Sequence, residues 1–257
     1  MKLGLCSVTF RSKSIEQVID LAMEAELDAI EWGGDVHVPP GDIDHAKNVL
    51  EMTKSRELEV SSYGSYYRVG DPEKNEHSFE TILETAQALH TTSIRVWAGT
   101  LDSEDADKSY RQSVIEDAKR IADMAGKENI SIHFEYHGGT LTNTKESAKQ
   151  LMEEVDHGNV YLYWQPAVGL SVEDRLASID LVKPWISNVH IFHWNQTERL
   201  DLGIGAKEWQ RYLKEIMSDQ KERYVLMEFV KNDDVQQFRK DALVLHELKK
   251  IIDGTNL

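Results

Sequence analysis

Short apolar runs recur along the chain, and longer stretches with a helical pattern of apolar and polar positions separate them. The runs are rich in β-branched and aromatic residues, and each has the length of one buried strand. Eight such runs can be recognised, at residues 2–8, 27–32, 58–63, 93–98, 130–135, 160–164, 186–192 and 223–229. The pattern therefore predicts eight strands.

The stretches between these runs have the pattern of amphipathic helices. In residues 14–27, Ile15, Val18, Ile19 and Ala22 share one helical face. Similar patterns, several of which begin at a Ser, Thr or Asp that can cap a helix, occupy residues 79–90, 109–128, 144–155 and 234–252. The predicted order is a strand followed by a helix, repeated eight times.

This alternation predicts a parallel sheet, because parallel neighbours need a long crossover connection. The chain has 257 residues, close to the ~250 that are typical of a closed (β/α)8 barrel. We therefore expect a single-domain α/β TIM barrel over residues 1–257. A doubly wound open sheet is the alternative, but the turn after the first strand reads CSVTFRSKS and lacks the Gly-x-Gly-x-x-Gly phosphate fingerprint.

Composition narrows the classes of function. Asp and Glu together number 45 against 29 Lys and Arg, and the formal net charge of -16 repels polyanions, so nucleic acid is not an expected ligand. The single Cys6 cannot form an internal disulfide, and no segment resembles a secretory signal or approaches the roughly 20 apolar residues of a membrane span. We expect a soluble, cytoplasmic protein without a membrane partner, and the sequence leaves its oligomeric state open.

Polar side chains mark the carboxyl ends of the last four predicted strands. Glu135 ends the fifth, Gln165 follows the sixth, His190 and His193 lie near the end of the seventh, and Glu228 ends the eighth. Active sites of such barrels lie at this end, and polar groups buried there must be paired, hydrogen-bonded or bound to a metal. Carboxylate, amide and imidazole ligands without a thiolate favour Mn²⁺, Mg²⁺ or Co²⁺, with Zn²⁺ as a further option.

Each of these residues also has a structural explanation. Glu228 alone could be a salt-bridged carboxylate of the barrel. His133 and His193 are better explained as packing or supporting groups, because one imidazole completes the ligand set. His137 lies two residues after Glu135, on the same side, and could orient that carboxylate or contact the substrate.

Four tryptophans lie at predicted strand ends, namely Trp32, Trp97, Trp164 and Trp194. They could be ordinary core residues. Because four around one mouth can form walls against the apolar face of a sugar ring or carbon chain, we predict that they bind substrate. Four arginines lie in or near possible mouth loops without forming a cluster, namely Arg11, Arg68, Arg95 and Arg199.

Four stretches give the chain a resemblance, over nearly its whole length, to the xylose isomerase-like barrel superfamily of sugar phosphate isomerases and epimerases. FEYHGGTLTNT (134–144) is similar to the Glu-x-His-x-Gly-Thr pattern after strand five, and WQPAVG (164–169) resembles the Trp-Asp-Pro-Ala segment after strand six. NVHIFHW (188–194) resembles the Val-His-x-Lys-Asp segment of strand seven, and LMEF (226–229) resembles the final strand with its glutamate. Together, in this order, these stretches are specific for the superfamily but not for a substrate.

The resemblance implies a divalent metal held by Glu135, Gln165, His190 and Glu228. The family usually has Asp at the position of Gln165. An amide oxygen can still bind a hard cation, but the formal charge of ligands plus metal changes from -1 to 0. We expect a weaker affinity and a stronger Lewis acid, and a metal-free descendant that only binds its ligand is the alternative.

The resemblance also implies an isomerase or epimerase that acts on a sugar or sugar phosphate. Such an enzyme removes a proton next to a carbonyl through an enediolate, which a dication stabilises, and Glu135 and Glu228 would exchange the proton from opposite faces. His137, His193 and Asn195 are then candidates for holding hydroxyl groups of a small carbohydrate, whose phosphorylation the sequence leaves open.

Other members of the superfamily offer further possibilities. Metal-dependent dehydratases of cyclic polyols or shikimate-like acids share the proton abstraction and are an alternative, as is a non-catalytic sugar-binding protein. Abasic-site endonucleases need a His-rich ligand set and a basic surface, which this sequence lacks.

Overall fold

Residues 1–254, which the computed structural model describes, contain eight strands that close into a barrel in chain order. The strands are β1 (Lys2–Cys6), β2 (Ala29–Gly33), β3 (Glu59–Arg68), β4 (Ser93–Trp97), β5 (Ser131–Glu135), β6 (Val160–Trp164), β7 (Ile186–Ile191) and β8 (Tyr224–Met227). All neighbours are parallel, and β1 pairs with β8 to close the sheet. The predicted TIM barrel is confirmed.

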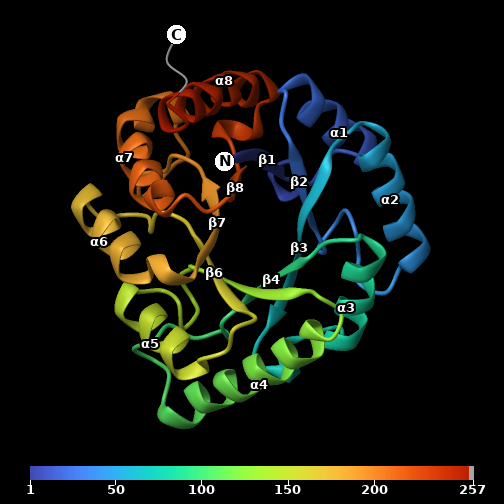
Figure 1. Cartoon of the computed structure of the whole chain (residues 1–257), viewed down its shortest axis with the longest axis vertical. Helices are drawn as coiled ribbons and strands as arrows, with labels where there is room; N and C mark the ends of the chain where they lie inside the picture. The colour runs from blue at the N-terminus through green and yellow to red at the C-terminus, as the bar shows by residue number, and fades with distance from the viewer. Residues whose placement is uncertain (255–257) are drawn as a thin grey trace.

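Helices surround the barrel (Figure 1). They are α1 (Ile15–Glu24), α2 (Ile43–Ser55), α3 (Phe79–Ala88), α4 (Lys108–Gly126), α5 (Lys145–Val155), α6 (Val172–Val182), α7 (Ala206–Ile216) and α8 (Val235–Ile252). Most begin at a side-chain cap, as α1 does at Ser14, whose hydroxyl accepts from the backbone N–H of Gln17. The last helix lies beside the first, where Arg239 is 2.6 Å from Glu24, so the ring of helices is closed as well.

The apolar core lies between the barrel and these helices. Side chains alternate along each strand, so every second residue faces the helices. Trp32 is fully buried there and donates its indole N–H to the Thr53 hydroxyl on α2 at 3.2 Å. Trp164 donates in the same way to Ser178 on α6 at 3.0 Å. The neighbours of these tryptophans, Glu31 and Gln165, therefore face the other side.

The longest strand is β3, which covers ten residues and extends beyond the predicted 58–63. Its second half carries Tyr66, whose φ of 58° is the left-handed conformation that a tyrosine rarely adopts. Elsewhere the predicted runs and the strands differ by a few residues at their ends. Within residues 1–254, no helix has both the length and the apolar character needed to cross a membrane.

Candidate active site

A cleft of about 430 Å³ opens at the carboxyl ends of the strands in the second half of the barrel. Glu135, Gln165 and Glu228 line its floor, and His137 and Trp194 are among its walls. The first three follow or end β5, β6 and β8. The parallel sheet places these ends at one rim, so residues far apart in the sequence meet there.

His190 on β7 lies at the centre of this group and is fully buried. Its Nδ1 atom is 3.2 Å from Gln165 Oε1, 3.4 Å from Glu228 Oε2 and 3.6 Å from Glu135 Oε1. Three oxygens from three different strands thus surround one ring nitrogen.

The opposite edge of the imidazole faces a second carboxylate. Glu31 Oε1 lies 3.5 Å from His190 Nε2 and accepts from the Cys6 thiol at 3.2 Å. The other Glu31 oxygen accepts from the Ser62 hydroxyl at 2.5 Å. Within residues 1–254, His190 Nε2 makes no hydrogen bond, so Glu31 acts on this edge of the imidazole through its charge.

A buried arginine joins two of these carboxylates. Arg95 is 1% exposed, and it donates from Nε to Glu31 at 2.9 Å and from Nη1 to Glu135 Oε2. The Trp97 indole N–H donates to the same oxygen of Glu135 at 2.6 Å. One oxygen of Glu135 is therefore fixed by two donors, and the other faces His190.

These contacts set the charge states of the site. Burial alone would raise the pKa of Glu135, but the charge of Arg95 and the hydrogen bond to His190 outweigh it and hold the pKa well below its ordinary value. Burial is outweighed in the same way for Glu31, whose pKa is also lowered, chiefly by Arg95. The His190 pKa rises well above its ordinary value because Glu228 and Glu31 outweigh burial. The surrounding carboxylates therefore favour the protonated form of His190.

The donor atoms of this group fit a divalent cation. Glu135, His190 and Glu228 each offer one atom, and these atoms lie within 4.8 Å of one another. Two ligands about 2.1 Å from one ion and at right angles are about 3 Å apart, close to the 3.2 Å between Gln165 Oε1 and His190 Nδ1. The structure thus brings together the four predicted ligands, and a cation could replace the proton of His190.

Three of the predicted substrate-binding residues lie at or beside the cleft. The His137 ring stacks on Trp97 at 4.8 Å, next to Glu135. Trp194 lines the cleft, and its buried indole N–H has no hydrogen-bond partner among residues 1–254.

The other four predicted substrate-binding residues point elsewhere. Trp32 and Trp164 lie in the core against α2 and α6, as described above, because strand alternation directs them away from the interior. His193 faces the start of α7, where a Cβ on Gly205 would lie 2.3 Å from its Nδ1. Asn195 folds back on its own turn and accepts from the Glu198 N–H at 2.8 Å. None of these four lines the cleft among the described residues.

The site also contains residues that the sequence interpretation did not assign to it, namely Cys6, Glu31, Ser62 and Arg95. A signal for two of them was present. Glu31 and Arg95 are charged residues inside short apolar strands, where an unpaired charge is too costly to persist, so each had to have a partner in the barrel.

Comparisons with known proteins support this fold. A family model described as xylose isomerase-like TIM barrel matches residues 19–254. A 3-dehydroshikimate dehydratase of Bacillus anthracis is 27% identical over 203 residues, which cover 74% of this chain and 71% of that protein.

Two solved structures have the same architecture. One is a probable 3-DHS dehydratase of Bacillus anthracis involved in petrobactin synthesis, with a TM-score of 0.78 and 22% identity over 96% of this chain and 99% of that one. The other is a 3-keto-D-glucoside 4-epimerase of E. coli, with a TM-score of 0.73 and 16% identity over 97% of this chain and 99% of that one. With the family match over most of its length, the chain belongs to the xylose isomerase-like TIM barrel family.

Proposed function

We propose that this protein is a metal-dependent enzyme that removes a proton next to a carbonyl group of a polyhydroxylated substrate. The observation that carries the proposal is the convergence of Gln165, Glu135 and Glu228 on one nitrogen of His190, at 3.2–3.6 Å. These four residues would hold the metal. A bound dication supplies charge stabilisation to the oxygens of the substrate as the proton leaves.

The hydrogen bonds support different roles for the two glutamates. Arg95 and Trp97 fix one oxygen of Glu135, so this carboxylate is held rigidly and is a weak base. Glu228 lines the cleft, and within residues 1–254 its one ion-pair partner is His190. Glu228 is therefore the better general base, and Glu135 serves mainly to bind and orient.

One free base suits a dehydration. The base takes the proton next to the carbonyl, a double bond forms, and the hydroxyl group on the following carbon leaves as water. With 3-dehydroshikimate the ring then holds a second double bond and tautomerises to a dihydroxybenzoate, without an oxidant. The 27% identical relative carries the name of this activity, so dehydration of a shikimate-like acid is our first candidate.

Arg68 is a candidate for contact with an acidic substrate. Its guanidinium lies 3.7 Å from the centre of the Trp97 ring, beside Glu135. Among the described residues no carboxylate is close enough to pair with it, although most other arginines are paired. Arg68 lines a neighbouring cavity of about 420 Å³ and not the cleft itself, so it would bind the carboxylate of a substrate only if that substrate extends past Trp97.

Epimerisation of a keto sugar is the second candidate. It needs two groups that exchange protons on opposite faces of the substrate, and Glu135 and Glu228 approach His190 from β5 and from the end of β8. The sugar epimerase among the structural neighbours is consistent with this alternative.

A single assay series tests both candidates. Chelator-treated protein is first titrated with Mn²⁺ by calorimetry, and we expect about one equivalent to bind and to raise the melting temperature. The loaded protein is then incubated in D₂O with 3-dehydroshikimate, an inosose and common ketohexoses. Dehydration gives water loss and a new aromatic or conjugated absorbance, whereas epimerisation gives deuterium next to the carbonyl with the carbonyl content unchanged.

Two results would decide against the proposal. Absence of Mn²⁺ binding at millimolar concentration removes the metal site. Binding without water loss or deuterium exchange on any of these substrates removes the chemistry and leaves the sugar-binding alternative.

A further inference from the structure

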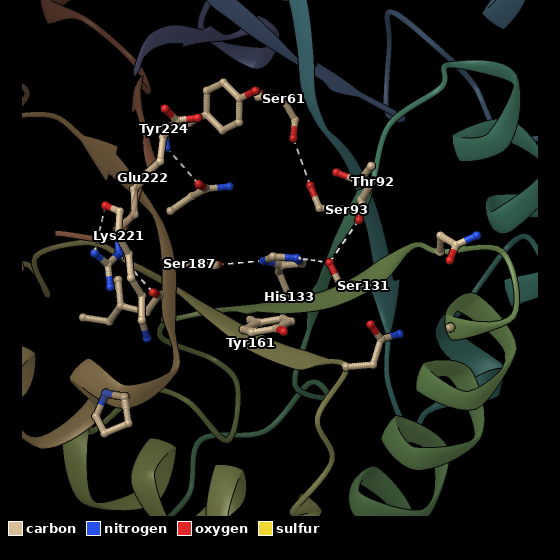
Figure 2. A pocket seen from close by; sticks show the side chains of 17 residues that line it. Ser61, Thr92, Ser93, Ser131, His133, Tyr161, Ser187, Lys221, Glu222 and Tyr224 are labelled. Atoms are coloured by element: carbon tan, nitrogen blue, oxygen red, sulfur yellow. Dashed lines mark hydrogen bonds between the residues drawn. The ribbon is translucent and has the colours of Figure 1, made fainter. Parts of the chain in front are cut away.

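A second cavity lies at the opposite end of the barrel, where the strands begin. Its volume of about 610 Å³ exceeds that of the candidate active site. It is lined by residues in the first half of β3 to β8 and by the segments that precede β4 to β8. Figure 2 shows hydroxyl groups and one imidazole gathered there.

The floor of this cavity is a hydrogen-bonded set of hydroxyl groups and one imidazole. His133 lies between Ser131, 2.7 Å from its Nε2, and Ser187, 2.6 Å from its Nδ1 (Figure 2). Ser93 donates to the backbone oxygen of Ser61 at 2.9 Å. These groups can donate and accept hydrogen bonds.

One buried hydroxyl in the cavity is without a partner. Ser61 is 3% exposed, and within residues 1–254 its Oγ makes no hydrogen bond. A buried hydroxyl is costly to leave unsatisfied, and it can donate one hydrogen bond and accept two. Ser61 therefore points to an occupant with polar atoms.

The charged side chains that line the cavity already have partners of opposite charge outside its lining. Arg223 donates to both carboxylate oxygens of Asp219, at 2.6 and 2.7 Å. Lys221 lies 3.7 Å from the same carboxylate, and Glu222 lies 3.5 Å from Lys2. An ionic ligand would have to compete with these pairs, so a neutral ligand fits better.

The cavity also has an aromatic side chain. Tyr161 stacks on His133 with ring centres 5.2 Å apart, and 37% of the residue is exposed (Figure 2). An aromatic ring beside a set of hydroxyl groups is the combination that receives the apolar face and the hydroxyls of a sugar ring.

We propose that this cavity is a second binding site, for a neutral polyhydroxylated molecule of the size of a monosaccharide or cyclitol. The site is separate from the cleft at the carboxyl ends and does not depend on the metal or on the reaction proposed there. Barrels commonly use this end for stability rather than function. A cavity filled only by water is therefore the competing explanation.

The test uses metal-free protein and two neutral probes, myo-inositol and D-glucose, in separate titrations followed by saturation-transfer NMR. We expect saturable binding of at least one probe to the wild-type protein. Tyr161→Leu removes the ring and should weaken binding by about tenfold, whereas Tyr161→Phe keeps the ring and should bind nearly as well. Ser61→Ala deletes the free hydroxyl and should also weaken binding.

Trp194→Leu, in the cleft at the other end, is the matched control and should leave probe binding unchanged. Far-UV circular dichroism of every variant checks that it is folded, and Tyr161→Leu decides the test if Ser61→Ala does not fold. Two outcomes overturn the proposal. Neither probe binds the wild-type protein saturably, or binding responds to Trp194→Leu and not to Tyr161→Leu.

Discussion

The two ends of the barrel share the same strands but contain different chemistry. On β5, Ser131 begins the strand beside the neutral imidazole of His133, whereas Glu135 ends it against Arg95 and His190. At the carboxyl end, charges are buried and held by opposite charges. At the amino end, hydroxyls and a neutral ring are held by hydrogen bonds alone. The single strand β5, from Ser131 to Glu135, thus connects the proposed cation site with the cavity proposed for a neutral molecule.

The difference shows how one parallel sheet separates its chemistries. Because each strand runs in the same direction, its first interior residue contributes to one mouth and its last to the other. Changes at either mouth should therefore have separate effects, and this separation can be tested.

The largest effect is expected from Glu228→Gln at the carboxyl end. The change deletes the proposed base but keeps an oxygen ligand, so turnover of the active substrate should fall by about 10²- to 10⁴-fold, while Mn²⁺ affinity falls much less. Steady-state kinetics and calorimetry measure the two quantities. Glu146→Gln, at a side chain 70% exposed on α5, is the control and should retain activity. Full turnover by Glu228→Gln would show that the base is another group.

Arg95→Met should have the largest effect on stability, because it leaves Glu31 and Glu135 buried without their shared cation. Breaking a buried ion pair costs about 3–5 kcal/mol, and urea unfolding of the metal-free protein measures the loss. Arg120→Met is the control, since Arg120 is 46% exposed in its pairs with Glu80 and Asp117 and such surface pairs contribute about 1 kcal/mol or less. Equal losses in the two variants would mean that the buried carboxylates do not depend on Arg95.

A third effect separates the two ends by pH. Burial lowers the pKa of His133 to about 3. Below pH 6.5, the ordinary pKa of histidine, the unfolded chain therefore binds a proton that the folded protein does not, and the free energy of unfolding decreases as the pH is lowered. Between pH 6.5 and 4.5 this amounts to ~2 kcal/mol. The pKa of Glu31 is lowered instead, so its contribution is present above 4.5 and is lost only as pH falls below that value.

Unfolding of metal-free protein at a series of pH values checks this expectation. His133→Gln should flatten the dependence between pH 6.5 and 4.5, and Glu31→Gln should change it only below that range. The other histidines with lowered pKa, His37 and His193, remain in all three proteins. A His133→Gln profile that is parallel to the wild type would mean that His133 does not titrate in this window.

The smallest effect tests the least usual ligand. Gln165→Asp adds a negative charge at the proposed metal site, and Mn²⁺ affinity should rise by about tenfold, because ligand charge tunes the affinity of such sites. Asn143→Asp is the control. It adds the same charge to the wall of the same cleft, but residue 143 is not one of the proposed metal ligands. If both variants bind Mn²⁺ more tightly to the same degree, Gln165 acts only through the field of the cleft and not as a ligand.

The sequence was sufficient to predict the barrel and the convergence of four site residues. Strands of a parallel sheet are buried on both faces and read as apolar runs, so Glu135 and Glu228 were conspicuous at their ends. Their arrangement followed from the rule that all such ends meet at one mouth.

The rest depended on contacts that the sequence does not display. Arg95 joins Glu31, 64 residues away, to Glu135, 40 residues away, and only the closed barrel sets those distances. The orientation of Trp32 and Trp164 was available in principle, since each follows or precedes an inward-facing polar residue on its strand. His193 and Asn195 lie beyond the end of β7, where no strand alternation determines direction.

The pairing of β1 with β8 has a consequence for how the protein is made. Lys2 lies opposite Tyr224, and Leu5 lies opposite Met227. The edge of β1 that does not pair with β2 therefore meets its partner strand only after more than two hundred further residues have left the ribosome. Until then the nascent sheet has two open edges, which are templates for pairing with other chains. Contacts so distant in sequence also slow folding. The seam between β1 and β8 is therefore the point at which nascent chains of this protein are most exposed to misassembly.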